Sequence, residues 1–291
     1  MFGILNIFKP HGVTSRDCVN IIQRIIRPEK VGHAGTLDPM AEGVLLVAIG
    51  QAVRLVDWMH ELPKSYVAEF ELGKTSESAD TETPVSILED CKMPNFEELQ
   101  TASLQFLGKI LQTPPTYSAV KIGGKRAYNL ARKGVEVIVP PRQVEVHRLN
   151  ILEYSPPMFK LHVQCGSGTY MRSLGRDLAR AVNSDAIMTA LLRTQVGPFD
   201  SQSAVPIQSL NANEDVLQHI QPPGNAIPHV PRVDLNEQEM GRIMQGQTVS
   251  IATPFPKHSQ VAAFDRDGHL RSLLSHRSGD LWGPFRNFIQ V

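Results

Sequence analysis

The longest uninterrupted apolar stretch of the chain, from Val44 to Ile49, sets the first limit on its fold. A short run of this kind is typical of a strand that is buried within a sheet. The run is far too short to cross a bilayer, which requires about 20 apolar residues in a helix. We therefore expect a globular chain that builds its core around a β-sheet.

Other segments alternate between strand and helix patterns. Strands are predicted for Ile4 to Phe8, Ser65 to Leu72, Val144 to Tyr154 and Phe159 to Cys165, and helices for Thr14 to Arg27, Phe96 to Leu107, Arg126 to Lys133, Thr169 to Val182, Ser184 to Leu192 and part of Val205 to Ile220. These elements show no regular strand–helix alternation, and several consecutive strands resemble hairpins. The pattern favours an α+β fold with a mixed or largely antiparallel central sheet.

Four prolines between Gln221 and Pro231 indicate a stiff linker at a domain boundary. Residues 1-225 are expected to form the large domain, and residues 230-291 a small, β-rich one. In the small domain a helix is predicted for Gln238 to Gln245. A hairpin is predicted around Asp265 to Gly268, because glycine suits the positive φ that such a turn requires.

Charge is balanced over the whole chain but segregated along it. The 291 residues carry 29 basic and 29 acidic side chains, which gives no global argument for binding nucleic acid. Residues 121–148 hold seven basic and two acidic side chains, a net charge of +5, whereas residues 73–100 hold seven acidic and two basic ones, a net charge of −5. The basic segment fits either an ordinary solvated surface or an RNA-binding face.

The cysteines and the first residues of the chain indicate the compartment. Cys18, Cys91 and Cys165 are widely spaced and form no Cys-x-x-Cys pair, so neither a disulfide framework nor a zinc site is predicted. The segment Met1 to Pro10 has no basic stretch before its short apolar run and does not resemble a signal peptide. We expect a cytoplasmic protein.

Asp38 stands in a glycine-containing loop directly before Pro39. Aspartate followed by proline is typical of a helix N-terminus, because the carboxylate accepts backbone N–H bonds and proline suits the first helical position. A loop carboxylate can also act as a nucleophile or base if a cation keeps it ionised. Arg172 is a candidate for that cation, although the spacing of Arg172, Arg176 and Arg180 also fits a solvated helix face.

A series of segments between residues 4 and 200 resembles, in order, the signature segments of the bacterial TruB-type tRNA pseudouridine-55 synthases. The segments are Leu5 to Ser15, Gly32 to Pro39, the strand with Tyr66, Gln112 to Lys121, Gly168 to Arg172 and Leu192 to Thr194. The chain departs from the family pattern at Ala34, where threonine is usual, and at Glu42, where a small or hydroxyl residue is common.

The resemblance implies an enzyme that flips uridine 55 out of the TΨC loop of tRNA and rejoins its uracil to the ribose through C5, without a metal or cofactor. Asp38 is then the nucleophile or base, Arg172 is its ion-pair partner, and Tyr66 stacks on the uracil. The residues expected to contact RNA are His33, Tyr170, Lys9, Lys121, Lys125, Arg126 and Arg132. An insertion at about 112–143 would grip the RNA, and the C-terminal domain loosely resembles a PUA-like RNA-binding module.

Two other functions are compatible with the same residues. One is a guide-dependent pseudouridine synthase, and the other is a non-catalytic tRNA-binding or RNA-folding protein. The small C-terminal domain and the lack of long basic tails favour the stand-alone enzyme, and the joint presence of Asp38, Tyr66 and Arg172 argues against pure binding. We expect a monomer that binds tRNA and needs no membrane and no obligate protein partner.

Overall fold

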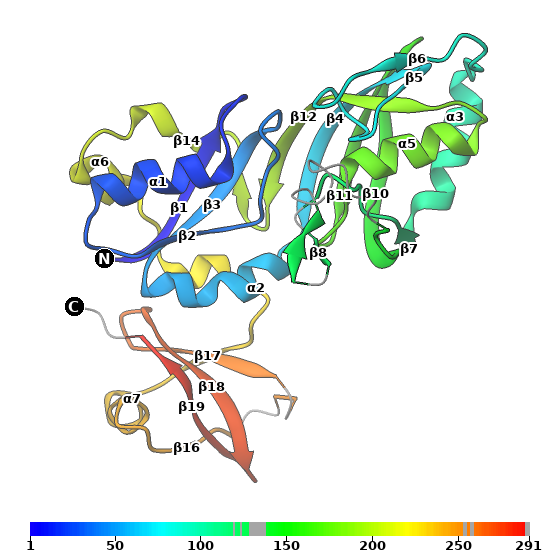
Figure 1. Cartoon of the computed structure of the whole chain (residues 1–291). Coiled ribbons are helices and arrows are strands. Elements are labelled where there is room, and N and C mark those ends of the chain that lie inside the picture. The colour runs from blue at the N-terminus through cyan, green and yellow to red at the C-terminus, as the bar shows by residue number, and fades with distance from the viewer. Residues whose placement is uncertain (119, 123, 128–137, 253–254, 257–258, 289–291) are drawn as a thin grey trace.

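The computed structural model describes residues 1–118, 120–122, 124–127, 138–252, 255–256 and 259–288, and it shows one large and one smaller main sheet (Figure 1). The strands are β1 (Phe2–Lys9), β2 (Val31–Ala34), β3 (Glu42–Gly50), β4 (Lys64–Leu72), β5 (Lys74–Thr75), β6 (Ser86–Ile87), β7 (Gly108–Gln112), β8 (Lys121–Ile122), β9 (Lys125–Arg126), β10 (Arg142–Ser155), β11 (Met158–Cys165), β12 (Ala186–Val196), β13 (Phe199–Asp200), β14 (Val205–Pro206), β15 (Arg232–Asp234), β16 (Val249–Ser250), β17 (Gln260–Phe264), β18 (Leu270–Ser278) and β19 (Leu281–Asn287). The α-helices are α1 (Ser15–Ile25), α2 (Val56–Glu61), α3 (Phe96–Ser103), α5 (Met171–Ala181), α6 (Asn213–His219) and α7 (Glu237–Met244). Among the described helices, none combines the length and apolar character that a membrane crossing requires.

The large sheet joins ten strands in the main order β14-β1-β3-β12-β4-β11-β10-β7, with β2 paired to β3 and β13 paired to β12. Most neighbours are antiparallel, but β1 with β14 and β3 with β12 are parallel. The predicted α+β fold with a mixed sheet is therefore confirmed. Because β12 lies between β3 and β4, the centre of the sheet brings together loops that are far apart in the sequence.

Strand β3 confirms the buried strand that the apolar run predicted. Its side chains alternate between the two faces of the sheet, and both faces are covered. One set, Leu45, Val47 and Ile49, lies in the core beneath α1, and the other set, Val44, Leu46 and Ala48, lies in the core that extends to the C-terminal sheet. Helix α1 contributes Cys18 and Ile22 to the first core, and Thr14 caps its N-terminus by accepting a hydrogen bond from the backbone N–H of Asp17 at 3.1 Å.

The other half of the sheet packs against α5 and α3 (Figure 1). Phe70 of β4 and Phe159 of β11 stack with ring centroids 5.0 Å apart. Gly175 of α5 lies directly against the Phe70 ring, since a Cβ at this position would overlap the ring. The helix is therefore seated close to the sheet, which fixes the place of Arg172 in its first turn.

The segment Ala186–Val196 is a strand, and the helix predicted for Ser184 to Leu192 is wrong. Its alanine, methionine and leucine residues favour a helix locally. The chain instead pairs with β4 over most of its length and with β3 near its end, and this tertiary pairing outweighs the local preference. The other predicted strands and helices are confirmed with ends shifted by a few residues, except the helix at residues 126–133, which falls largely outside the described residues.

The predicted linker is packed against the large sheet rather than free. Gln221 and Ile4 of β1 exchange two backbone hydrogen bonds, at 2.9 and 2.7 Å. Ala226 and Ile227 are buried in the core that β3 shares with the C-terminal sheet. That sheet has the order β15-β17-β18-β19-β16, and its β17-β18 hairpin and helix α7 confirm the elements predicted there. The proline-rich segment therefore joins the large sheet to the C-terminal sheet through a core that both share.

Candidate active site

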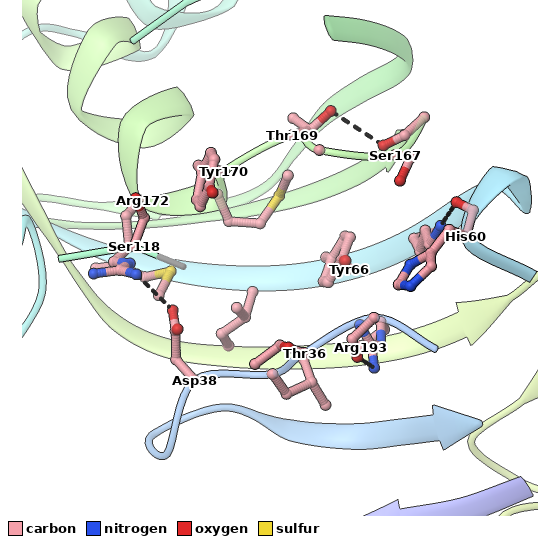
Figure 2. A pocket seen from close by; sticks show the side chains of 18 of the residues that line it. Thr36, Asp38, His60, Tyr66, Ser118, Ser167, Thr169, Tyr170, Arg172 and Arg193 are labelled. Atoms are coloured by element: carbon pink, nitrogen blue, oxygen red, sulfur yellow. Dashed lines mark hydrogen bonds and ion pairs between the residues drawn. The ribbon is translucent and has the colours of Figure 1, made fainter. Parts of the chain in front are cut away.

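The loop that carries Asp38 connects β2 to β3 and runs along one wall of a pocket (Figure 2). No helix begins at Asp38, because the backbone N–H of Ala41 donates to the Asp38 carbonyl at 3.0 Å and closes a turn that β3 follows. The helix-cap interpretation of Asp38 is therefore wrong. The buried Oγ of Ser15 holds the loop next to Asp38, since it accepts from the N–H of Leu37 at 2.9 Å and donates to the Leu37 carbonyl at 3.1 Å.

Lys9 lies inside the protein, which contradicts its predicted contact with RNA phosphates. Its side chain has no exposed surface, and burial lowers its pKa. Its Nζ donates to the carbonyl oxygens of Val13 at 2.6 Å, Pro10 at 3.0 Å and Pro39 at 3.3 Å. Lys9 thus ties the loop after β1 to the residue that follows Asp38, and it positions the Asp38 loop instead of the substrate.

Arg172 lies between two carboxylates at one end of the pocket. Its Nη2 is 2.9 Å from Oδ2 of Asp38, and its Nη1 is 3.2 Å from Oδ2 of Asp80 (Figure 2 shows the pair with Asp38). The two nitrogens also donate to the carbonyl oxygens of Ser78 at 3.1 Å and Tyr117 at 2.9 Å. The side chains of Arg172 and Asp80 are 3% and 1% exposed, whereas that of Asp38 is 36% exposed. The buried side therefore holds the guanidinium, and Asp38 presents the accessible carboxylate.

Asp80 is a site residue that the sequence did not single out. Its Oδ1 accepts hydrogen bonds from Ser78 Oγ at 2.5 Å and from the backbone N–H of Glu82 at 2.8 Å. Its only signal in the sequence was a place within the acidic segment 73–100. That signal does not distinguish a buried ion-pair partner from the solvated acidic residues around it.

Burial raises the pKa of Asp38 above the ordinary aspartate value. The Asp80 and Glu82 carboxylates raise it further, and the Arg172 guanidinium lowers it. Desolvation therefore outweighs the arginine that was expected to keep Asp38 ionised. A carboxylate with a raised pKa is more basic, which suits a group that must act as a base or nucleophile.

Tyr66 of β4 lies near the middle of the pocket, between the ends marked by Asp38 and Arg193 (Figure 2). Arg193 of β12 is its direct partner in the antiparallel β4-β12 register, and both residues line the cavity. Arg193 is 1% exposed, and its Nε and Nη2 donate to the carbonyls of Val44 at 2.7 Å and Gly35 at 3.0 Å. The sequence placed Arg193 in a segment typical of a family but assigned it no role.

The predicted residues share one cavity of about 260 Å³. Asp38, Tyr66, Tyr170 and Arg172 all line it. The end opposite Asp38 is formed by His60 and Lys64, which the sequence also missed (Figure 2 shows His60). Lys64 Nζ donates to the His60 carbonyl at 2.5 Å, and burial, with a contribution from Arg193, lowers the pKa of Lys64 to about 8. One end of the cavity thus combines the Asp38 carboxylate with the Arg172 guanidinium, whereas the other end contains only basic side chains.

Tyr170 stands directly before α5 and borders the cavity. The side-chain amide of Gln112 bonds its backbone, accepting from the Tyr170 N–H at 2.7 Å and donating to its carbonyl at 3.1 Å. The Arg142 guanidinium lies 4.8 Å from the centre of the Tyr170 ring. Gln112 thus holds the backbone of Tyr170, Arg142 lies over its ring, and Tyr170 is one of the residues that line the cavity.

The remaining predicted RNA contacts lie away from the cavity or outside the described side chains. His33 belongs to strand β2, where it pairs with Val47, and not to the loop in which it was expected. It is not among the described residues that line the cavity. The structure describes Lys121, Lys125 and Arg126 only as backbone of β8 and β9, and Arg132 lies outside the described residues.

Comparison with known proteins is consistent with this geometry. Residues 23–171 match the model of the family described as TruB family pseudouridylate synthase (N terminal domain). A protein of Rhodopirellula baltica named tRNA pseudouridine synthase B is 36% identical, with 99% of this chain and 90% of the relative covered. A protein of the same name from Dehalococcoides mccartyi is 36% identical, with 100% of this chain and 97% of the relative covered. Another, from Lactobacillus gasseri, is 35% identical, with 97% of this chain and 96% of the relative covered.

Solved structures show the same fold. A chain in the crystal structure of a Cbf5-Nop10-Gar1 complex has a TM-score of 0.76 and 25% identity, with 99% of this chain and 85% of that chain covered. A chain in the archaeal box H/ACA sRNP Nop10-Cbf5 complex has a TM-score of 0.74, and the match covers 99% of this chain and 86% of that chain. Its sequence identity is 24%, so this similarity supports the fold alone. The family match and the full-length relatives agree with the cavity that contains Asp38, Tyr66 and Arg172, and the chain belongs to the TruB family of pseudouridylate synthases.

Proposed function

We propose that Asp38 is the nucleophile with which this pseudouridine synthase isomerises uridine 55 in the TΨC loop of tRNA. The observation that carries the proposal is the 2.9 Å ion pair between Asp38 and Arg172 in the cavity that Tyr66 also lines. Family membership and full-length relatives named tRNA pseudouridine synthase B support an isomerase that acts on tRNA.

The reaction breaks the bond between C1′ of the ribose and N1 of uracil and makes a new bond from C1′ to C5. These atoms are not accessible in a stacked base, so the nucleotide must leave the RNA stack and enter the cavity, at a cost of about a few kcal/mol. Asp38 meets the flipped nucleoside because its carboxylate is the exposed member of the Asp38–Arg172–Asp80 group. Contacts with the cavity wall offset the cost of extrusion.

Each wall residue has a separate task in this proposal. Arg172 orients the Asp38 carboxylate and compensates part of its desolvation. Tyr66 stacks on the uracil, and its hydroxyl assists the late removal of the C5 proton. Tyr170, held by Gln112 and Arg142, closes the side of the cavity next to α5.

RNA outside the flipped nucleotide is proposed to contact the basic segment and the C-terminal sheet. Lys121, Lys125, Arg126 and Arg132 would meet phosphates of the stem-loop, and His33 would contact the disrupted loop. Residues 1-225 then act as the catalytic domain and residues 230-291 as a PUA-like RNA-binding domain. The net charge of +5 in residues 121–148 supports an electrostatic contribution to binding.

Incubation of the purified protein with an unmodified tRNA transcript, followed by pseudouridine mapping, tests the function. The wild type is expected to modify position 55 without a guide RNA, and Asp38→Asn to form no product while binding the transcript with the wild-type affinity. Glu153→Gln, the same acid-to-amide change at an exposed side chain that pairs with Lys160 on the large sheet, is the matched control that keeps activity. Turnover by Asp38→Asn would exclude Asp38 as the nucleophile.

Salt dependence of binding tests the basic segment. Lys125→Ala with Arg126→Ala is expected to reduce the slope of log K against log salt by about two, since each phosphate contact contributes about one unit. Lys92→Ala with Arg180→Ala changes two exposed basic residues outside the segment and should leave the slope unchanged. An unaltered slope in the Lys125–Arg126 variant would remove these residues from the RNA interface.

A guide-dependent enzyme is the alternative, and the similarity to a chain in a Cbf5-Nop10-Gar1 complex at 25% identity is the observation that favours it. The sequence relatives favour the stand-alone form, since they are about 35% identical over nearly the full chain. The tRNA assay separates the two forms directly. Modification that appears only after addition of a guide RNA and accessory proteins would support the guide-dependent form.

A further inference from the structure

Arg193 is the largest fully buried side chain of the described residues, and it lies in the cavity wall. Its hydrogen-bond partners are the carbonyls of Val44 and Gly35, and Tyr66 lies opposite it in the β4-β12 register. Within the part of the chain that the structure describes, it forms no ion pair with a carboxylate. Its positive charge is therefore compensated only by neutral hydrogen-bond acceptors.

A buried cation without a carboxylate partner is costly, because dipoles replace its hydration only in part. The same cation strongly stabilises any negative charge that develops beside it, since water does not screen the interaction. Lys64, which also lines this end of the cavity, adds a second cation. This end is therefore built to receive negative charge during the reaction.

The group best placed to carry that charge is the hydroxyl of Tyr66. Tyr66 and Arg193 face each other across β4 and β12, so the sheet register itself sets their contact. Burial raises the pKa of Tyr66, and the charge of the Arg193 guanidinium opposes that rise. Cys165 and Asp38 also face Tyr66, and both raise its pKa. Arg193 is the one neighbour among these that favours the phenolate.

The last step of the isomerisation needs a base at this position. After the bond from C1′ to C5 has formed, C5 still carries its hydrogen, and a double bond joins N1 to C6. A phenolate oxygen of Tyr66 takes the C5 proton, the C5–H electron pair forms the C5–C6 double bond, and the N1–C6 pair moves to N1. N1 then takes up a proton, and Tyr66 returns its own to water, so protons and electrons balance.

We propose that Arg193 is a positioning residue that stabilises the phenolate form of Tyr66 while Tyr66 removes the C5 proton. This inference rests on the role of Tyr66 in the proposed function. Arg193 thereby acts late in the reaction, after Asp38 has completed its part at the opposite end of the cavity (Figure 2).

A purely structural role for Arg193 makes a different prediction. Its Nη2 holds the carbonyl of Gly35, three residues before Asp38. If Arg193 served only to fix that loop, its loss would displace Asp38 and slow the cleavage of the C1′–N1 bond. The two roles therefore differ in which chemical step becomes slow.

The kinetic isotope effect of tRNA that carries deuterium at C5 of uridine 55 separates these steps. Arg193→Gln removes the charge but keeps an amide donor, and it should lower kcat by about 100-fold, the lower end of general acid–base contributions. The isotope effect is expected to rise above the wild-type value, because removal of the C5 proton becomes rate-limiting. The effect is a ratio measured on one enzyme sample, so partial loss of folded protein does not produce it.

Further variants make the test specific. Arg193→Lys keeps the charge and should recover most of the activity. If Arg193→Gln does not fold, the isotope effect is measured on Arg193→Lys instead. Arg180→Gln, the same substitution at an exposed arginine, should change neither kcat nor the isotope effect. In a Tyr66→Phe background, Arg193→Gln should add little further loss, because both substitutions act on one step.

A slower Arg193→Gln enzyme whose isotope effect stays at or below the wild-type value would overturn the proposal and leave Arg193 as a loop clamp. Additive losses in the Tyr66→Phe background would overturn it as well. Neither result concerns Asp38, whose role depends on the separate Asp38→Asn assay. Failure of the inference is thus distinguishable from failure of the proposed function.

Discussion

The two ends of the cavity each contain a buried arginine, and the two differ in what surrounds the charge. Arg172 pairs with the carboxylates of Asp38 and Asp80, whereas Arg193 donates to two backbone carbonyls and lies opposite Tyr66. The charge of Arg172 is therefore largely compensated before substrate arrives, and that of Arg193 is not. One end is arranged to orient an existing carboxylate, and the other to stabilise a charge that forms only during the reaction.

Removal of each guanidinium should cost a different amount of stability. Arg172→Met leaves two carboxylates without their cation and is expected to lower the free energy of unfolding by about 3–5 kcal/mol, as for other buried pairs that lose one partner. Arg193→Met leaves only neutral carbonyls unpaired, which costs about 1–3 kcal/mol. Urea unfolding of both variants at pH 7 measures the difference. Equal losses would contradict the contrast between the two ends.

Lys64 extends the comparison, because it is a second uncompensated cation at the Arg193 end. Its pKa falls from 10.5 to about 8 in the folded protein. Between these values the unfolded chain binds more protons than the folded one, so the stability contribution of Lys64 rises with pH from about 8 to 10.5 and is lowest below 8. Lys64→Met should therefore stabilise the protein at pH 7 by about 2 kcal/mol, once about 1 kcal/mol for the lost His60 hydrogen bond is subtracted.

Thermal unfolding of wild type and Lys64→Met across this pH range checks the prediction. The wild type should gain stability relative to the variant as the pH rises above 8. Lys160→Met, at a half-buried lysine with two carboxylate partners, is the control and should show no such gain. A parallel pH dependence of wild type and Lys64→Met would mean that the buried cation carries no penalty.

At the Arg172 end of the cavity, activity should depend on pH in the acidic range. Because the pKa of Asp38 is raised, activity should fall with decreasing pH before the ordinary aspartate value of 3.8 is reached. Asp80 contributes to the raised pKa of Asp38, so Asp80→Asn should move this acidic limb of kcat/KM to lower pH. Asp234→Asn, far from the cavity, should leave it in place. An upward shift in Asp80→Asn would show that loss of the Arg172 anchor outweighs the loss of repulsion.

Much of the framework was predictable from the sequence, because it depends on local patterns. The apolar run at Val44–Ile49 predicted a buried strand, and the prolines and glycines marked most element ends. The strand Ala186–Val196 was predicted as a helix because its residues prefer one, and only its pairing with β4 and β3 reveals the strand. The proline-rich segment was predicted as a linker, and only its burial against β1 and β17 shows that it is part of the core.

The site residues also divide into those that the sequence predicted and those whose place only the structure revealed. Asp38, Tyr66 and Arg172 were predicted from segments that resemble a family, and the structure places all three in one cavity. Lys9 was assigned to RNA because an isolated lysine in a sequence looks the same whether it is exposed or buried. Its three carbonyl partners come from loops before and after α1, and only their assembly determines that it is buried.

The sequence alone determined the family, the carboxylate loop, the strand of Tyr66 and the helix of Arg172, since these are encoded in neighbouring residues and their periodicity. The tertiary structure decided which charges are compensated. Asp80 reaches Arg172 and Arg193 reaches Tyr66 across long stretches of chain, because the order β3-β12-β4 brings their elements together. The protonation of a buried group depends on such neighbours and on the loss of water around them. The chemical difference between the two ends of the cavity therefore appears only in the folded protein.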